Sequence, residues 1–103
     1  MTGGWELEKG GWIYIMSDRY RGGMYTGVTA DLPFRTTQHR EGKGSDFVRK
    51  YGFTRLVYME WHDEIEDAIQ REKAIKKWRR ASKIELIESM NPDWDDLYDR
   101  LNS

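Results

Sequence analysis

Cysteine is absent from the 103 residues, and histidine occurs only twice. A chain without thiols forms no disulfide and no thiolate metal site, and two imidazoles are too few for a zinc site built mainly on histidine. No apolar run approaches the roughly 20 residues that cross a bilayer, and the polar, glycine-rich start "MTGGWELEKGG" is unlike a signal peptide. These absences predict a soluble, cytoplasmic protein without a membrane segment.

The net charge is only −1, so the chain as a whole is neither strongly acidic nor strongly basic. The distribution along the chain is more informative. Residues 71–83 hold seven Lys or Arg and one Glu, whereas residues 85–99 hold six Asp or Glu and no Lys or Arg. A basic patch beside an acidic tail is compatible with phosphate binding on one face. A solvated helix surface explains the same pattern, and charge alone favours that simpler interpretation.

Hydrophobic periodicity predicts the secondary structure. Alternation and β-forming residues predict strands at 11–18, 24–30 and 54–61. Helical spacing interrupted by glycine and proline predicts helices at 32–40, 45–51, 63–79 and 81–90, with one or two further turns in the tail at 93–101. Asp31 is placed to cap the first helix, and Pro33 suits its first turn.

The order β-β-α-α-β-α-α predicts an α+β fold, in which helices flank a three-stranded antiparallel sheet. The length suffices for one domain with one modest core. We therefore expect a single domain at residues 11–101, preceded by a flexible lead at residues 1–10.

The long predicted helix carries a carboxylate on its apolar stripe. The apolar positions follow helical spacing: Ile65, Ala68, Ile69 and Ile75. Glu72 lies seven residues after the first of them, on the same stripe, where a carboxylate is costly unless it is paired or binds a cation. A buried salt bridge, for example with Arg35, and a metal ligand explain this position equally well.

Polar residues also lie on the inward side of the first predicted helix. Arg35 and His39 share one face with Leu32 and Thr36, one turn apart. A helix whose polar side happens to include an arginine and a histidine is the simpler explanation. A pair of site residues is the functional one.

The first two predicted strands supply two tyrosines and a glycine. Tyr25 and Gly27 share a face of the second strand, and Tyr14 lies on the neighbouring strand. Glycine within a strand marks a place where another group comes close, and we expect a hydrated metal ion and a phosphate there. A paired-tyrosine core patch is the alternative. Arginine, a carboxylate and proton-transfer groups together suit phosphodiester hydrolysis.

These segments resemble the GIY-YIG nuclease family, in particular small stand-alone bacterial members similar to the N-terminal catalytic domain of the excision-repair nuclease. "WIY" at 12–14 and "YTG" at 25–27 stand where the family has its two tripeptides. "DLPFRTTQH" resembles the helix with the family arginine, and "AIQREKAIKKW" the helix with the metal-binding glutamate. The ending "NPDWDDLY" resembles the tail of the stand-alone subgroup. Trp12 and Thr26 depart from the family tripeptides.

The resemblance implies the GIY-YIG fold and DNA cleavage with one Mg²⁺ or Mn²⁺ ion. It implies that Glu72 holds the ion, Arg35 stabilises phosphorane charge, His39 orients or relays a proton, and Tyr14 or Tyr25 helps to activate water. An unperturbed phenol, with a pKa near ~10, needs help to act as a base at neutral pH.

The resemblance also implies contacts with the DNA. We expect these from Gly27, Lys43, Arg49, Lys76 and Asn91, the last as the counterpart of a family asparagine. Phosphate contacts of this kind give salt-dependent binding without base readout, so we expect little sequence specificity in DNA repair or processing. Exposed tryptophans leave a monomer or a weak homodimer open. The alternatives are a catalytically inactive nucleic-acid-binding module and a protein-interaction module.

Overall fold

The computed structural model describes residues 10–43 and 46–102. The predicted lead at residues 1–10 lies, apart from Gly10, outside these ranges. The elements in chain order are β1 (Gly11–Ser17), β2 (Met24–Thr29), α1 (Leu32–Arg40), α2 (Asp46–Tyr51), β3 (Arg55–His62), α3 (Ile65–Lys76), α4 (Arg80–Met90) and the 3₁₀ helix η2 (Leu97–Asn102). The predicted order and the predicted α+β class are confirmed.

The sheet has the order β2-β1-β3, and both pairs are antiparallel. The β1–β2 register places Tyr14 opposite Gly27 and Met16 opposite Tyr25. A register shift between Ile15 and Met16 interrupts the pairing of β1 with β3. Because β1 lies in the centre, β2 and β3 are the two edge strands of the sheet.

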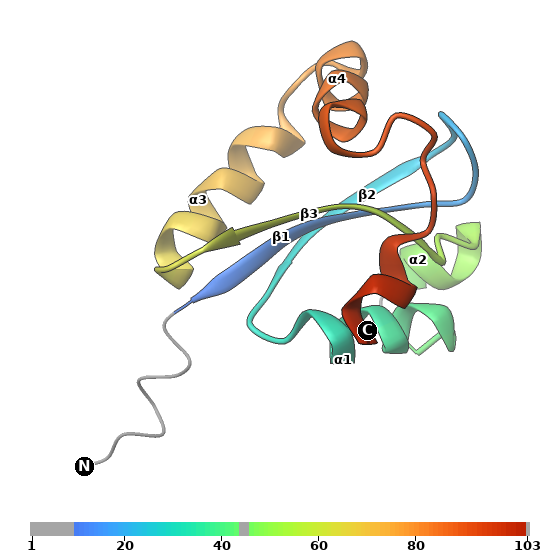
Figure 1. The fold of residues 1–103 in the computed structure, drawn as a ribbon, viewed down its shortest axis with the longest axis horizontal. Coiled ribbons are helices and arrows are strands. Elements are labelled where there is room, and N and C mark those ends of the chain that lie inside the picture. Colours follow the sequence, from blue (N-terminus) through green and yellow to red (C-terminus); the bar gives the residue numbers. More distant parts are fainter. Residues whose placement is uncertain (1–9, 44–45, 103) are drawn as a thin grey trace.

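Helices cover both faces of this sheet (Figure 1). On one face, α1, α2 and η2 pack against alternate β1 residues that include Tyr14 and Met16. On the other face, α3 and α4 pack against Ile13 and Ile15. Because side chains alternate along a strand, β1 supplies a core to both layers.

The helix α3 is shorter than predicted, and its stripe is different. It begins at Ile65 and ends at Lys76, instead of spanning residues 63–79. The amides of Lys77 and Trp78 bond carbonyls three residues back, which tightens the turn and ends the helix. The prediction that Ile69 faces inward is wrong, because Ile69 is exposed, and the buried positions of α3 are Ala68, Glu72 and Ile75.

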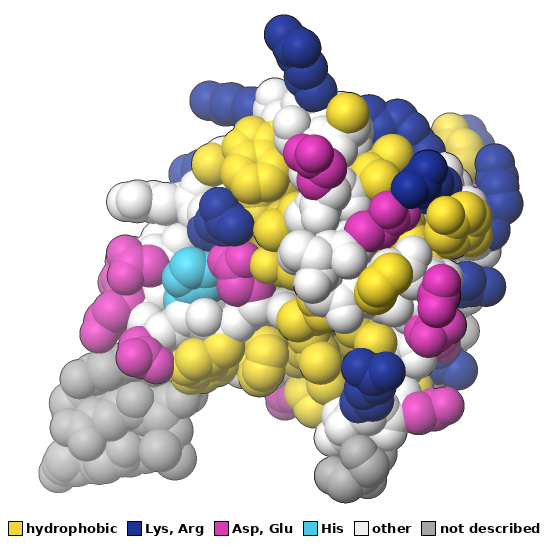
Figure 2. Space-filling view, turned by 45° about the horizontal axis from the view of Figure 1, so that its top comes forward, with side chains coloured by type: hydrophobic (Ala, Val, Ile, Leu, Met, Phe, Trp, Pro, Cys, Tyr) yellow, Lys and Arg dark blue, Asp and Glu magenta, His cyan; other side chains and the backbone are white. Residues whose placement is uncertain are grey.

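Among residues 10–43 and 46–102, no helix has the length and apolar character to cross a membrane. In Figure 2 most Lys and Arg side chains lie in the upper half of the view, the side on which α3 and α4 cover the sheet. This distribution agrees with the basic run at residues 71–83.

Candidate active site

The helix α1 begins at a well-formed cap. The Asp31 carboxylate accepts a hydrogen bond from the amide of Phe34 at 3.1 Å, as the sequence predicts. The cap fixes the helical phase, so that Leu32, Thr36 and His39 are buried and Arg35 is half-buried. The predicted inward face of α1 is confirmed.

Gly27 makes room for the Tyr14 phenol. A Cβ atom added at Gly27 would lie 2.5 Å from both Cζ and the hydroxyl oxygen of Tyr14. We expected a metal ion and a phosphate to approach this glycine. That expectation needs correction, because the Tyr14 side chain fills the space beside Gly27. The contribution of Gly27 is to seat Tyr14, and the geometry gives no support for a direct contact of Gly27 with substrate.

Tyr14, Tyr25 and His39 form one cluster with Arg35. The Tyr14 hydroxyl lies 2.9 Å from Nε2 of His39 in a buried hydrogen bond. The Tyr25 ring lies edge-on to His39, with centroids 5.5 Å apart, and 6.3 Å from the Tyr14 ring. Tyr14 is fully buried and His39 is 1% exposed, whereas Tyr25 is half-buried. Tyr25 is therefore the tyrosine of the pair that solvent reaches.

The surroundings keep both buried groups neutral. Burial, and next the Tyr25 phenol, raise the pKa of Tyr14 well above its ordinary value, although Arg35 acts in the opposite direction. Burial and the positive charge of Arg35 lower the pKa of His39. At neutral pH we therefore expect a protonated phenol beside an uncharged imidazole, which is able to accept a proton.

Two buried polar atoms of this cluster have no hydrogen-bond partner among the described residues: Nε of Arg35 and Nδ1 of His39. Such atoms are rare in folded proteins, because each costs roughly 1–3 kcal/mol when unpaired. An N–H of a guanidinium matches the oxygens of a phosphate. The cluster thus contains a charged donor suited to an anionic ligand.

Glu72 lies on the other face of the sheet, because α3 packs there. The Glu72 side chain is 12% exposed, and its carboxylate forms a 2.7 Å ion pair with Lys76, one turn further along α3. The partner suggested from the sequence, Arg35, lies on the opposite face, so that suggestion is corrected. Lys76, which the sequence predicts to bind DNA, is the partner in this ion pair.

Glu72, as a single carboxylate ligand, suits only a metal site whose other ligands are water and substrate. Within the described residues, no group of three or more His, Cys, Asp or Glu side chains converges on one point. A single carboxylate fits Mg²⁺ or Mn²⁺, because such ions keep several waters and take further ligands from substrate phosphates. Glu72 is thus able to hold an ion together with substrate, in competition with Lys76.

The other predicted DNA contacts are dispersed. Lys43 is exposed after α1 and lies 3.6 Å from the Glu41 carboxylate, and Arg49 is exposed on α2. Asn91 is 4% exposed and caps α4. Its amide donates to the carbonyls of Val57 and Asp95. These contacts are structural, and nothing in the placement of Asn91 supports the expected substrate contact.

The C-terminal tail fixes α1, a role that no local pattern signals. The hydroxyls of Thr37 and Tyr98 are 2.6 Å apart. Arg40 binds Asp96 at 2.5 Å and lies over the Tyr98 ring at 4.3 Å. Because these pairs are 56 to 61 residues apart in sequence, local periodicity does not reveal them. The tail therefore supports the helix that carries Arg35.

Comparison with known proteins agrees with this architecture. The model of the GIY-YIG catalytic domain matches residues 10–85. A UPF0213 protein of Staphylococcus saprophyticus is 34% identical over 76 residues, which cover 74% of this chain and 92% of that protein. A UPF0213 protein of Clostridium perfringens is 36% identical over 78 residues, or 76% and 83% of the two chains.

A solved structure shows the same fold. The solution NMR structure of the UPF0213 protein BH0048 from Bacillus halodurans has a TM-score of 0.53 and 29% identity, and the match covers 84% of this chain and 92% of that one. These names state no activity. They agree with the resemblance drawn from the tripeptides and the two helices, and with residues 10–85 matched they show that this chain belongs to the GIY-YIG catalytic-domain family.

Proposed function

We propose that this protein is a divalent-metal-dependent DNA endonuclease, which hydrolyses phosphodiester bonds with little sequence specificity in DNA repair or processing. The observation that carries the proposal is the buried Arg35 Nε, without a hydrogen-bond partner among the described residues, beside the hydrogen-bonded Tyr14–His39 pair. A guanidinium donor beside a neutral imidazole supplies both charge stabilisation and a proton acceptor.

The assigned roles follow from exposure. Arg35 binds the phosphate and stabilises the negative charge that develops on its oxygens. Tyr25, the half-buried tyrosine, contacts the attacking water. Tyr14 is fully buried, and its hydroxyl is hydrogen-bonded to Nε2 of His39 at 2.9 Å, so it serves as a positioning group. His39, held neutral and hydrogen-bonded to that hydroxyl, orients Tyr14 and is the group that relays a proton.

Glu72 is the residue that would hold Mg²⁺ or Mn²⁺. When bound, such an ion lowers the pKa of a water ligand and stabilises charge on the leaving oxygen. β2 is an edge strand. A DNA phosphate bound by Arg35 on one face of the sheet can therefore reach the Glu72 carboxylate on the other face around that edge. The scissile phosphate therefore lies beside β2 in the proposed complex.

The test is a cleavage panel of single-stranded, duplex, flap and junction DNA, with and without Mn²⁺. We expect metal-dependent cleavage by the wild type and loss of cleavage in Glu72→Gln. Glu66→Gln is the control, because Glu66 is an exposed acid in the first turn of the same helix. Failure of the wild type to cut any of these DNAs would sink the endonuclease proposal.

One observation favours a second function. The Glu72 carboxylate is already paired with Lys76 on the far side of the sheet from Tyr14. This arrangement fits a nucleic-acid-binding module of the same fold without catalysis. Salt-dependent DNA binding without cleavage under any metal condition would establish that function in place of the first.

A further inference from the structure

A shallow hollow of about 720 Å³ lies where α3 gives way to α4. Its volume falls in the range of sites for small molecules, roughly 300–1,000 Å³. Seven residues line it: Lys77, Trp78 and Arg79 from the connector, and Ser82, Glu85, Leu86 and Ser89 from one face of α4. None of these residues belongs to the cluster around Tyr14, so the hollow is a separate feature.

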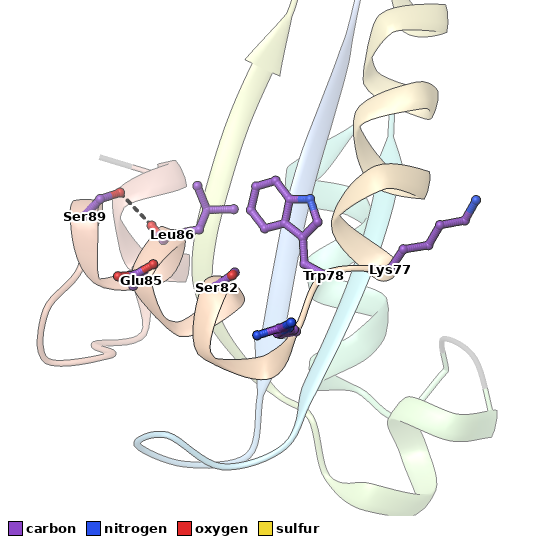
Figure 3. Close-up of a pocket in the computed structure, with 7 residues that line it drawn as sticks. Lys77, Trp78, Ser82, Glu85, Leu86 and Ser89 are labelled. Atoms are coloured by element: carbon purple, nitrogen blue, oxygen red, sulfur yellow. Dashed lines mark hydrogen bonds between the residues drawn. The ribbon is translucent and has the colours of Figure 1, made fainter.

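The hollow has apolar walls. Figure 3 shows the Trp78 indole and the Leu86 side chain facing each other between the two helices. Trp78 is half-buried and packs partly against the cluster of Ile13, Ala68 and Ile75. A flat aromatic wall opposite an aliphatic one suits a planar ring, because aromatic faces stack.

The indole lies next to a network of charged and polar side chains. The Arg71 guanidinium lies 5.2 Å from the centroid of the Trp78 ring. The carboxylate of Glu60 fixes Arg71 through two hydrogen bonds, at 3.0 and 3.2 Å. Tyr58 and His62 bind the same carboxylate, both at 2.5 Å. This network orders Trp78 before any ligand arrives, which lowers the entropic cost of binding.

Polar groups around the walls are available to a ligand. Within the described residues, the side chains of Ser82 and Glu85 and the indole N–H of Trp78 have no hydrogen-bond or ion-pair partner. They offer a hydroxyl, an acceptor and a donor, whereas the Ser89 hydroxyl already donates to the Leu86 carbonyl at 2.6 Å. The edge of a nucleobase carries both donors and acceptors and matches such a set.

Cations flank the opening. Arg79 lines the hollow, and Lys77 extends from the connector away from α4. Neither has an ion-pair partner in the described part of the chain. Trp78 follows Glu72 by six residues, a distance of roughly 9 Å along a helix axis. A strand whose phosphate lies near Glu72 therefore has cations along its path to the hollow.

We propose that this hollow, walled by Trp78 and Leu86, binds an unpaired nucleobase, so that the protein prefers DNA with single-stranded nucleotides over a continuous duplex. A base inside a duplex is stacked on its neighbours and does not enter such a site without being extruded. Stacking on an aromatic side chain is tolerant of base identity, in agreement with little sequence specificity. The proposal rests on the proposed function only in taking DNA as the ligand.

The experiment measures binding without cleavage. Fluorescence anisotropy with a labelled oligothymidine, and with a duplex of equal length, is recorded in EDTA. We expect the wild type to bind the single strand at least tenfold more tightly than the duplex. Ser82→Trp, which fills the hollow, and Arg79→Glu, which reverses a flanking charge, should each weaken single-strand binding at least tenfold. Ala81→Trp adds the same bulk at an exposed position outside the lining and should bind like the wild type.

Equal wild-type affinity for duplex and single strand would overturn the proposal, as would wild-type affinity for the single strand in either Ser82→Trp or Arg79→Glu. Binding to neither DNA would also overturn it. The cleavage panel is independent of these measurements. Cleavage with unaltered binding in both variants contradicts the hollow alone, whereas the expected binding without cleavage contradicts the endonuclease alone.

Discussion

The Tyr14 phenol occupies the space in which a side chain at residue 27 would lie, 2.5 Å from the position of a Cβ atom on Gly27. The two residues face each other across the β1–β2 register. This contact seats Tyr14 against His39, and through His39 it sets the geometry of the whole cluster. The absence of a side chain at one strand position is thus a requirement of the site.

Gly27→Ala should therefore destabilise the protein and reduce cleavage. The added methyl group has to displace a fully buried ring, and overpacking of this kind costs about 1–3 kcal/mol. Urea denaturation measures the loss. In a Tyr14→Leu background the same change should cost at least about 1 kcal/mol less, because the phenol is gone. A variant within about 0.5 kcal/mol of the wild type would contradict the packing described here.

The lowered pKa of His39 makes stability depend on pH. Above the ordinary value of about 6.5, the imidazole is neutral in both the folded and the unfolded chain, and its contribution is fully present. As the pH falls below that value, the unfolded chain takes up a proton that the folded chain accepts only at lower pH. Stability is therefore lost as the pH falls from 6.5 toward the folded pKa.

His39→Gln tests this linkage. Unfolding free energies at pH 7.5 and pH 5.5 should differ more in the wild type than in the variant. His62 and the carboxylates are present in both proteins, so their contributions cancel in the comparison. An equal loss in both proteins would show that His39 is not held neutral by burial and Arg35.

Local chemistry in the sequence predicts the elements and their inward faces. Asp31 and Pro33 mark the start of α1, and the spacing of Leu32, Thr36 and His39 predicts its buried side. Alternation along β1 predicts that Tyr14 and Ile13 face opposite layers. Each of these inferences depends on contacts within a few residues, where periodicity and capping decide the outcome.

The way in which separate elements pack against one another is harder to predict from the sequence. The periodicity of α3 shows that Glu72 faces inward, but it does not show which face of the sheet α3 covers. The suggested Arg35 partner was wrong for this reason, because α1 and α3 lie on opposite faces. The inward prediction for Ile69 was wrong because the stripe of α3 is narrow and passes through Glu72. The sequence likewise does not show that Asn91 ends α4, with its backbone N–H bonded to the Ile87 carbonyl and its side-chain amide donating to Val57 of β3.

The tail should stabilise α1 through Asp96. This carboxylate accepts hydrogen bonds from the amides of Leu56 and Tyr98, at 3.1 and 3.0 Å, and binds Arg40. Asp96→Ala removes the acceptor of bonds that lie at or near the surface, where water replaces it, and should cost about 0.5–1.5 kcal/mol. Amide hydrogen exchange in α1 should also become faster. Asp99→Ala, at an exposed acid of η2, is the control, and equal effects of the two changes would refute the role of the tail.

Lys76 and a metal ion should compete for Glu72. Removal of the ammonium group in Lys76→Ala frees the carboxylate, so Mn²⁺ should raise the melting temperature at lower concentration than in the wild type. Glu72→Gln should show no such rise. Lys73→Ala removes an exposed lysine of the same helix and should titrate like the wild type. Identical Mn²⁺ titrations of Lys76→Ala and the wild type would argue against a metal site at Glu72.

The most direct test of the nuclease account is the rate of Mn²⁺-dependent nicking by the wild type and by Arg35→Ala, with the melting temperature of each recorded in parallel. The account predicts that the wild type nicks DNA and that Arg35→Ala loses a factor of about 10²–10³ in rate, the usual cost of removing one preorganised donor to a transition-state oxyanion, while remaining folded. Nicking by folded Arg35→Ala at the wild-type rate would contradict it.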